Sequence, residues 1–231
     1  MKKRTLLLPA AGSATRMRGL PKFLLPTHAS NTSLIERHLN FLGEQFDEIL
    51  IGINPDFSHL LKSVLDESLK LKIVEMKTQT MMETVTNLCN KSTSASFFLI
   101  MPDTFFSNYT EIVKFICDDN LYDTNLLCWE LQDFQKGKLG QVSVNKNDLI
   151  TDIRDKDSEC TYKYFWGAAA FSKDNLRVVD DKEAHVGFMY EKLLARNIKV
   201  GAIKIQGSYY DCGTQEEYIR MLTEPKENNL I

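Results

Sequence analysis

The chain has 231 residues, 43% of them hydrophobic and 26% charged, which is enough to bury the core of one globular domain. Its net charge of −3 argues against a general nucleic-acid binder, and no apolar run approaches the roughly 18 residues of a membrane-spanning helix. The five cysteines form no CxxC motif and no Cys/His cluster, which argues against a zinc site. Their odd number is typical of a reducing compartment, so we expect a cytoplasmic protein.

The first part of the chain alternates between strand-like and helix-like segments. Short apolar runs typical of buried strands lie at residues 5–8, 48–53, 72–76 and 96–101. Apolar residues at helical spacing lie between them, at residues 33–46, 55–69 and 82–90. Ser33 and Glu36 form the sequence pattern of a capping box at the start of the first of these helices. The alternation predicts an α/β domain with a mostly parallel central sheet flanked by helices, in a Rossmann-like arrangement.

The second part of the chain is richer in strands. Four strand-like segments follow one another at residues 124–131, 140–145, 149–154 and 164–171. Because few helices separate them, we expect antiparallel pairing and a small lobe. The chain continues with a helix, a strand, a closing helix and a polar end, at residues 183–196, 199–205, 214–222 and 223–231. No linker or internal repeat divides the chain, so we expect a single domain over residues 1–231.

The loop that follows the first strand combines small residues with cations. Residues 10–14 read Ala-Ala-Gly-Ser-Ala, and Arg16 and Lys22 follow in the same loop. Small side chains leave backbone N–H groups accessible to phosphate oxygens, while arginine and lysine add positive charge. The first 35 residues hold six lysines and arginines and no acidic residue, which also favours an anion site. The loop lacks the GKS or GKT of a Walker loop and the GxGxxG of a dinucleotide-binding fold.

Two aspartates are candidate partners of this loop. Asp103 follows the strand at residues 96–101, and Asp211 stands shortly before the helix at residues 214–222. Ligands of parallel sheets bind beyond the carboxyl ends of the strands, where the loop and Asp103 should meet. Taken singly, Asp103 is also explained as a turn residue and Asp211 as a helix cap. Taken together beside an anion loop, they are typical of Mg²⁺ ligands, because Mg²⁺ prefers one or two carboxylates together with water and phosphate oxygens.

In this order the motifs resemble those of the sugar-1-phosphate nucleotidyltransferases. That family has LAGGxGTR followed by Met or Leu, then PK, an Asp after a mid-sheet strand, a Gly before the lobe strands, an acid-Lys pair, a second Gly and DxGT. The counterparts here are Pro9-Ala10-Ala11-Gly12-Ser13-Ala14-Thr15-Arg16-Met17, Pro21-Lys22, Asp103, Gly140, Asp155-Lys156, Gly167 and Asp211-Cys212-Gly213-Thr214. The resemblance covers nearly the whole chain. It implies an enzyme that moves a nucleoside monophosphate from a nucleoside triphosphate to a sugar-1-phosphate and releases pyrophosphate, in the synthesis of NDP-sugars and polysaccharides.

The resemblance assigns roles to the charged residues. Arg16 and Lys22 would be catalytic, with Arg16 neutralising the β/γ end of the triphosphate and Lys22 reaching the α-phosphate. Asp103 and Asp211 would hold Mg²⁺, the implied cofactor. Lys156 would bind the phosphate of the second substrate, although its charged surroundings alone are typical of a solvated hairpin.

The remaining roles follow the two parts of the chain. Residues 1–123 would form the nucleotide-binding half and residues 124–222 the substrate-binding half, with a tail at 223–231. The implied nucleotide-binding residues are Pro9, Ala10, Ala11, Gly12, Ser13, Ala14, Thr15, Arg16, Gln79 and Thr84. The implied residues for the second substrate are Gly140, Asp155, Lys156 and Gly167. The implied partners are small molecules, with no nucleic acid and no membrane, and a homo-oligomer stays open.

Departures from the family pattern leave the finer identity open. Ala14 stands where the family has a second glycine, and alanine there costs about 1 kcal/mol or more if the position requires a positive φ. Ala11 replaces another glycine, as in the cytidylyltransferases of isoprenoid and polyol pathways, whose loops begin PAAG. Gln79 lacks the Pro and Gly expected after it, while Thr84-Val85 is similar to the Ser-Val of those cytidylyltransferases. The alternatives are therefore a cytidylyltransferase for a polyol or amino-alcohol phosphate, and a non-catalytic nucleotide-sugar sensor.

Overall fold

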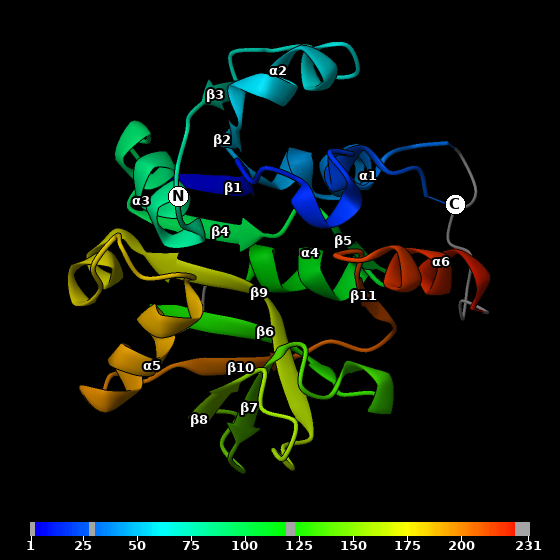
Figure 1. The fold of residues 1–231 in the computed structure, drawn as a ribbon. Helices are drawn as coiled ribbons and strands as arrows, with labels where there is room; N and C mark the ends of the chain where they lie inside the picture. The colour runs from blue at the N-terminus through cyan, green and yellow to red at the C-terminus, as the bar shows by residue number, and fades with distance from the viewer. Residues whose placement is uncertain (1–2, 28–30, 119–122, 225–231) are drawn as a thin grey trace.

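The centre of the computed structural model, which describes residues 3–27, 31–118 and 123–224, is a nine-stranded sheet (Figure 1). Its strands are β1 (Arg4–Ala10), β2 (Glu48–Ile53), β3 (Leu71–Glu75), β4 (Ser96–Ile100), β6 (Thr124–Glu130), β7 (Gly140–Val144), β8 (Ile150–Asp155), β9 (Tyr164–Ser172) and β10 (Gly201–Lys204). Seven of them follow the order β10-β6-β9-β4-β1-β2-β3, and β7 joins β8 to β9. Strands β4, β1, β2 and β3 are mutually parallel, as are β6 and β10. Strand β9 runs antiparallel to β4 and β6.

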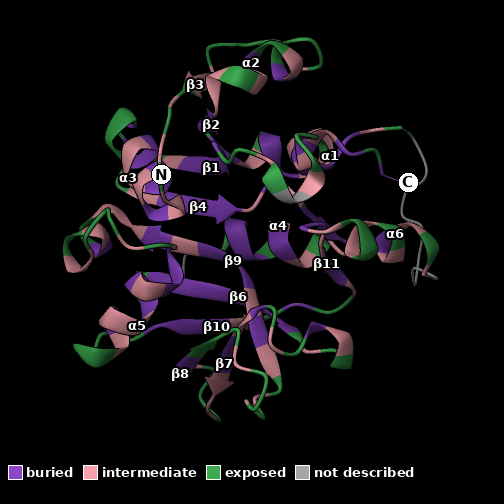
Figure 2. Ribbon diagram, in the orientation of Figure 1, coloured by how far each residue is buried: buried purple, intermediate pink, exposed green. Residues whose placement is uncertain are grey.

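Helices cover both faces of this sheet. The helices are α1 (Leu34–Leu42), α2 (Pro55–Lys62), α3 (Met81–Lys91), α4 (Thr110–Cys117), α5 (Gly187–Ala195) and α6 (Gln215–Thr223). Leu6 and Leu8 of β1 pack in one cluster with α1, α2 and α4, whereas Leu7 packs in another with α3 and α5. All three leucines are fully buried, and the sheet interior is buried throughout (Figure 2). In the described part of the chain, no helix has both the length and the apolar character needed to cross a membrane.

The fold class expected from the sequence is confirmed. The sheet is mostly parallel, and β7, β8 and the start of β9 form the small antiparallel lobe, at the bottom of Figure 1. The capping box of α1 is present, because Ser33 Oγ accepts from the Glu36 N–H group and the Glu36 carboxylate accepts from the Ser33 N–H group.

Three helices are shorter than expected, and the first of them, α1, ends at Leu42 and is followed by a 3-10 turn at Gly43–Gln45 instead of continuing to residue 46. Helix α2 ends at Lys62 instead of residue 69, and α5 begins at Gly187 instead of residue 183. Beyond α2, Ser68 turns the chain, because its hydroxyl accepts hydrogen bonds from the N–H groups of Lys70 and Leu71. Serine side chains that bond nearby backbone groups compete with the helix in this way.

A second, two-stranded sheet and helix α4 were not expected from the sequence. Strand β5 (Thr104–Phe106) pairs antiparallel with β11 (Tyr209–Asp211), which joins the middle of the chain to its end. Helix α6 follows, and its N-cap is Thr214, whose hydroxyl accepts from the Glu217 N–H group. Asp211 is therefore not the cap of this helix. Most of the polar end expected at residues 223–231 lies outside the described residues.

A buried polar network ties together the four parallel strands at the edge where β1 and β2 begin. Glu48 at the start of β2 accepts hydrogen bonds from Thr5 of β1, from Lys72 of β3 and from Ser92 just before β4. The carboxylate of Glu48 is buried, so burial alone would raise its pKa. The three hydrogen bonds and the positive charge of Lys72 outweigh burial and hold the pKa of Glu48 below its usual value.

Candidate active site

The loop after β1 turns through a short 3-10 helix at Thr15–Met17. Ala14 precedes this turn with φ of 54°, in the left-handed region, and its carbonyl accepts from the N–H groups of Met17 and Gly19. An L-residue in this conformation costs about 1 kcal/mol relative to glycine, so the loop carries backbone strain. Beside Gly12 the loop is open, because an added Cβ would meet no atom within 4 Å. The side chain of Arg16 lies outside the described part of the structure.

A cavity of about 370 Å³ lies beyond the carboxyl ends of the parallel strands. Its walls come from the loop after β1, the start of α2, the segment after β3 and the segment after β4. Apart from Arg16, every residue that the motifs assigned to the nucleotide contributes to its lining, together with one catalytic candidate and one metal-ligand candidate. These lining residues are Pro9, Ala10, Ala11, Gly12, Ser13, Ala14, Thr15, Lys22, Gln79, Thr84 and Asp103.

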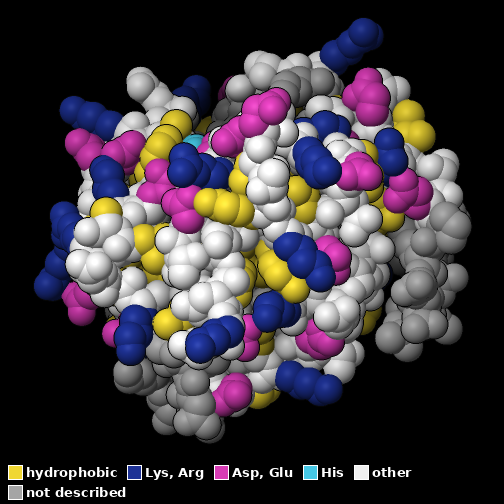
Figure 3. All heavy atoms as spheres, turned by 90° about the horizontal axis from the view of Figure 1, so that it is seen from below, with side chains coloured by type: hydrophobic (Ala, Val, Ile, Leu, Met, Phe, Trp, Pro, Cys, Tyr) yellow, Lys and Arg dark blue, Asp and Glu magenta, His cyan; other side chains and the backbone are white. Residues whose placement is uncertain are grey.

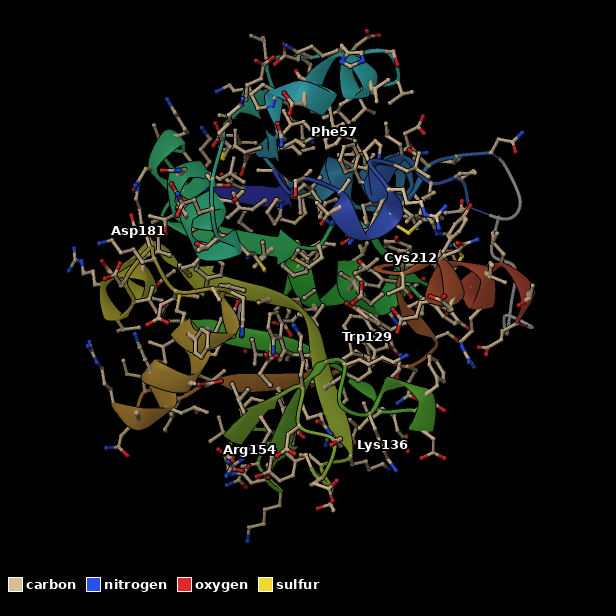
Figure 4. The ribbon with its side chains drawn as sticks, viewed as in Figure 1. Phe57, Trp129, Lys136, Arg154, Asp181 and Cys212 are labelled. Atoms are coloured by element: carbon tan, nitrogen blue, oxygen red, sulfur yellow. The ribbon has the colours of Figure 1, made fainter. Side chains whose placement is uncertain are left out.

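The cavity also has lining residues that sequence reasoning missed. Phe57 in the first turn of α2 lies beside the cavity, on the inner side of that helix (Figure 4). Thr78 and Thr80 line it as well, and the hydroxyl oxygens of Thr78 and Thr84 are 2.6 Å apart. A usable signal existed, because all three missed residues lie within about five positions of the carboxyl ends of β2 and β3, where ligands of parallel sheets bind.

Lys22 and Asp103 meet at the floor of the cavity. Lys22 begins the short 3-10 helix Lys22–Leu24, and its Nζ donates to Asp103 Oδ2 at 3.1 Å. The side chains are only 13% and 20% exposed, so this ion pair is far less solvated than a surface pair. The lysine is therefore held beside the carboxylate of Asp103, which follows the carboxyl end of β4.

Strand pairing brings Asp211 next to Asp103. In the register of β5 and β11, Asp211 lies opposite Thr104, the residue after Asp103. The N–H group of Cys212, which follows Asp211, donates to the carbonyl of Asp103 at 3.0 Å. Two aspartates 108 positions apart in the sequence thus sit on adjacent backbone segments.

The negative charges of both aspartates affect the pKa of the Tyr209 hydroxyl. Burial, followed by the negative charges of Asp211 and Asp103, raises the pKa of the Tyr209 hydroxyl well above its usual value. The ring of Tyr209 covers Gly167, where an added Cβ would collide with the ring carbons. Gly167 therefore packs against the ring of Tyr209, and its lack of a side chain is required by that packing.

The donor set formed by Asp103 and Asp211 fits Mg²⁺. Both groups are carboxylates on adjacent backbone segments, and the negative charges of both act on Tyr209, so a divalent cation bound by both would be favoured. Among the described residues no three His, Cys, Asp or Glu side chains form a cluster that would hold a metal alone. Mg²⁺ takes one or two protein carboxylates and completes its shell with water and phosphate oxygens.

Three of the four residues assigned to the second substrate, Gly140, Asp155 and Lys156, lie at the open end of the β7–β8 hairpin, whereas Gly167 lies in β9. Gly140 pairs with Asp155 in the strand register, and Lys156 follows with φ of 53°, its N–H group bonded to the Leu139 carbonyl. A lysine in the left-handed region is strained, and such strain is concentrated at functional positions. A Cβ at Gly140 would collide with the indole of Trp166. None of these four residues lines the cavity described above.

His185 was not expected and is the side-chain partner of Asp155. Its Nε2 lies 3.2 Å from Asp155 Oδ2, and its Nδ1 accepts from the Gly187 N–H group, so a neutral ring donates to the carboxylate. The segment that carries His185 also contacts the cavity lining through two backbone carbonyls. The carbonyl of Ala184 accepts from the N–H group of Met81, and the carbonyl of Asp181, a residue labelled in Figure 4, accepts from the Thr80 hydroxyl. This contact joins the lobe to the cavity.

Comparison with solved structures identifies the fold. No protein-family model matches the chain, and no curated protein matches it. The chain is similar to a Bacillus anthracis protein assigned as a glucose-1-phosphate thymidylyltransferase, crystallised with sucrose, at 16% identity and a TM-score of 0.80, covering 95% of this chain and 94% of that one. It is similar to the inositol-1-phosphate CTP transferase of T. maritima at 16% identity and a TM-score of 0.78, covering 96% of both chains.

A third solved structure has the same fold. It is a UDP-glucose pyrophosphorylase complexed with UDP-glucose, with 17% identity, a TM-score of 0.79, and coverage of 96% of this chain and 97% of that one. These likenesses extend over essentially the full length of the chains compared. The chain therefore has the fold of the sugar-phosphate nucleotidyltransferases, which is the fold that the motif resemblance implied.

Proposed function

We propose that this protein is a nucleotidyltransferase that moves a nucleoside monophosphate from a nucleoside triphosphate to a small phosphorylated substrate, with a sugar-1-phosphate as the favoured acceptor. One observation carries the proposal: Lys22 and Asp103 form an ion pair in the lining of a cavity whose loop exposes backbone groups, and Asp211 lies on the backbone segment next to Asp103. The three residues are far apart in the sequence, and each has a chemically defined task in phosphate transfer.

The reaction needs charge compensation more than acid–base chemistry. A phosphate oxygen of the acceptor forms a bond to the α-phosphorus, and the bond from that phosphorus to the bridging oxygen breaks, so that pyrophosphate leaves. The attacking oxygen is already an anion, so no general base is required. Two polyanions must instead be brought together and held in line, which fixed cationic groups achieve by positioning and electrostatics.

The residues of the cavity suit these tasks. The segment Pro9–Thr15 would hold the base, the ribose and the triphosphate through backbone groups, and Arg16 would neutralise the β/γ end. Lys22 would stabilise the charge that develops at the α-phosphate. Asp103 and Asp211 would hold Mg²⁺, which supplies electrostatic stabilisation of the phosphate oxygens when it is bound.

The lobe would receive the acceptor. In this proposal residues 1–123 form the nucleotide half and residues 124–222 the acceptor half. Lys156 would bind the acceptor phosphate, and its strained backbone supports a functional role. Gly140, Asp155 and Gly167 would border the organic part of the acceptor.

A cytidylyltransferase for a polyol phosphate is the second candidate. The PAAG start of the loop favours it, as does Thr84, whose hydroxyl faces Thr78 at the cavity wall. A binding screen of CTP, UTP, GTP, dTTP and ATP by thermal shift separates the candidates, because the best ligand raises the unfolding temperature most. Stabilisation without turnover would favour a nucleotide-sugar sensor.

The direct test is pyrophosphate release from a panel of nucleoside triphosphates and sugar or polyol phosphates in the presence of Mg²⁺. We expect turnover with at least one pair, and losses of about 100-fold or more in Asp103→Ala and Lys22→Ala. Lys62→Ala is a matched control, because Lys62 is an exposed lysine paired with Glu75 on the outside of α2. Equal rates in all four proteins would end the proposal.

A further inference from the structure

A buried histidine contacts the residue that lies between the two aspartates. His38 on α1 is fully buried, and it is not part of the cavity lining. Its Nδ1 lies 2.9 Å from the hydroxyl of Tyr109, and its Nε2 lies 3.4 Å from Thr104 Oγ1. The Thr104 hydroxyl lies 2.7 Å from the carbonyl oxygen of Met101. These contacts form one continuous chain of hydrogen bonds from α4 to the turn that holds Asp103.

The directions of the hydrogen bonds follow from the last acceptor. The Met101 carbonyl can only accept, so the Thr104 hydroxyl donates to it and accepts from His38 Nε2–H. His38 Nδ1 is then an acceptor, and the Tyr109 hydroxyl donates a hydrogen bond to it. This requires a neutral imidazole, and burial lowers the pKa of His38 from 6.5 to about 3. Burial also raises the pKa of Tyr109, so that this hydroxyl keeps its proton.

The backbone of Thr104 lies next to that of both aspartates. It follows Asp103 in the sequence and lies opposite Asp211 in the pairing of β5 with β11. Its N–H group and its hydroxyl both donate to the Met101 carbonyl, at 3.2 Å and 2.7 Å, which closes the turn that carries Asp103. A shift of Thr104 would therefore move the backbone of both aspartates together.

Aromatic packing holds the other end of the chain of hydrogen bonds. The ring of Tyr109 stacks on Phe41 with centroids 4.5 Å apart, and Phe106 packs against it at 5.5 Å. Phe106 also contacts the ring of His38 at 5.0 Å. This packing restricts the Tyr109 hydroxyl and the imidazole of His38. Because His38 is hydrogen-bonded to Thr104, the position of Thr104 is restricted as well.

We infer that His38, acting between Tyr109 and Thr104, is a positioning residue that holds Asp103 and Asp211 in the arrangement that binds the divalent cation. The inference rests on the proposed function and adds to it a residue that no motif indicates. His38 touches neither substrate nor metal in this account. Its effect on cation binding comes through the backbone of Thr104, which is adjacent to both aspartates.

The test uses variants that remove a single hydroxyl. Tyr109→Phe keeps the packed ring but removes the donor to His38, and Thr104→Val keeps the shape of the side chain but removes the acceptor. Thr104→Ser retains the hydroxyl and is the rescue variant, and Thr110→Val, at an exposed threonine at the start of α4, is the control. The probe is Mn²⁺ alone, whose binding to the full chain is measured by the loss of the free-ion signal in electron paramagnetic resonance.

We expect Tyr109→Phe and Thr104→Val to weaken Mn²⁺ binding about tenfold, as substitutions that disturb the support of metal ligands do. Amide hydrogen exchange should also become faster in residues 101–106 and 209–212. The rescue variant and the control should behave as the wild type. A lower unfolding temperature with unchanged Mn²⁺ affinity and unchanged local exchange would overturn the inference, because it would show a purely structural role.

Failure of the proposed function looks different in the same experiment. If wild-type protein binds no Mn²⁺, or binds it as tightly after Asp103→Asn, the proposed metal site is wrong and the inference falls with it. If the wild type binds Mn²⁺ through Asp103 and both hydroxyl variants bind it equally well, only the inference about His38 is overturned.

Discussion

The two parts of the candidate site are held in place by different kinds of contact. Asp103 and Asp211 are positioned by backbone hydrogen bonds, namely the pairing of β5 with β11 and the bond from Cys212 N–H to the Asp103 carbonyl. Asp155 and Lys156 lie on an exposed hairpin, where the side-chain partner of Asp155 is His185. Backbone pairing persists when side chains change, whereas contacts between solvated side chains contribute little and weaken with salt. We therefore expect the metal and nucleotide side to be preformed and the lobe side to adjust when the acceptor binds.

The surface supports the same contrast. On the face seen from below, lysine and arginine side chains are interspersed with aspartate and glutamate (Figure 3). Ion pairs such as Arg154–Asp152 and Lys204–Asp148 are partly or largely exposed in the lobe region, unlike the largely buried pair of Lys22 with Asp103. The charged groups of the lobe are thus more solvated than Lys22 and Asp103 at the cavity.

The largest effect is expected where the site is preformed. Asp103→Asn should lower kcat/KM for pyrophosphate release by about 10³-fold, or about 4 kcal/mol, because it removes a charge that the rigid site cannot replace. Asp133→Asn is the control, since Asp133 is an exposed acid that pairs with Lys136. If Asp103→Asn retained most of the activity, the metal side could not be described as more rigid and less replaceable than the lobe side.

A smaller, more selective effect is expected in the lobe. Lys156→Ala should raise KM for the acceptor by about 10- to 100-fold, the value of one charged hydrogen bond, and leave the affinity for the nucleoside triphosphate unchanged. Lys146→Ala, at an exposed lysine in the turn between β7 and β8, should change neither constant. Steady-state kinetics with each substrate varied in turn separates the two effects. An equal loss of nucleotide affinity would show that the two parts are not independent.

The rigidity of the nucleotide side should depend on the buried network around Glu48. Glu48→Gln should lower the free energy of unfolding by about 2 kcal/mol at neutral pH, because it weakens hydrogen bonds to a buried charge. The folded-state pKa of Glu48 lies below its unfolded value of 4.5, so its stabilisation is present above pH 4.5 and is lost as the pH falls through the folded pKa. Urea unfolding should therefore show the wild type and variant converging in acid. A constant gap at all pH values would contradict this.

The smallest effect concerns the strained turn of the phosphate loop. Ala14 has φ of 54°, so Ala14→Gly should relieve strain and raise the free energy of unfolding by up to about 1 kcal/mol. Urea unfolding measures the change, and Ala184→Gly, at an exposed alanine before α5, controls for the added flexibility of glycine. A loss of stability in Ala14→Gly as large as in the control would show that the turn carries no strain.

Much of the nucleotide side could be predicted from the sequence, because the order of its strands and helices and the position of its ligand loop follow from general rules. Alternating apolar segments indicated β1 to β4 and their helices, and the carboxyl ends of parallel strands indicated where the loop and Asp103 would meet. The roles assigned to Lys22, Asp103 and Asp211 stay predictions, although the structure places these residues together.

The rest could not be predicted, for identifiable physical reasons. Strands β5 and β11 have three residues each and pair across about a hundred positions, so neither has a local pattern. The apolar spacing of Leu65 suggested a longer helix, but Leu65 packs against the core after α2 has ended. The contacts of His185 with Asp155 and of His38 with Thr104 join side chains from distant segments, and nothing in the spacing of either histidine indicates its partner.

The account rests most directly on the claim that Asp103 and Asp211 bind one cation together. A double-mutant cycle with Asp103→Asn, Asp211→Asn and the double variant, with Mn²⁺ affinity measured by electron paramagnetic resonance, tests it. The account predicts that each single variant loses most of the affinity and that the double variant is scarcely worse than either. Independent, additive losses, or wild-type affinity in Asp211→Asn, would contradict it.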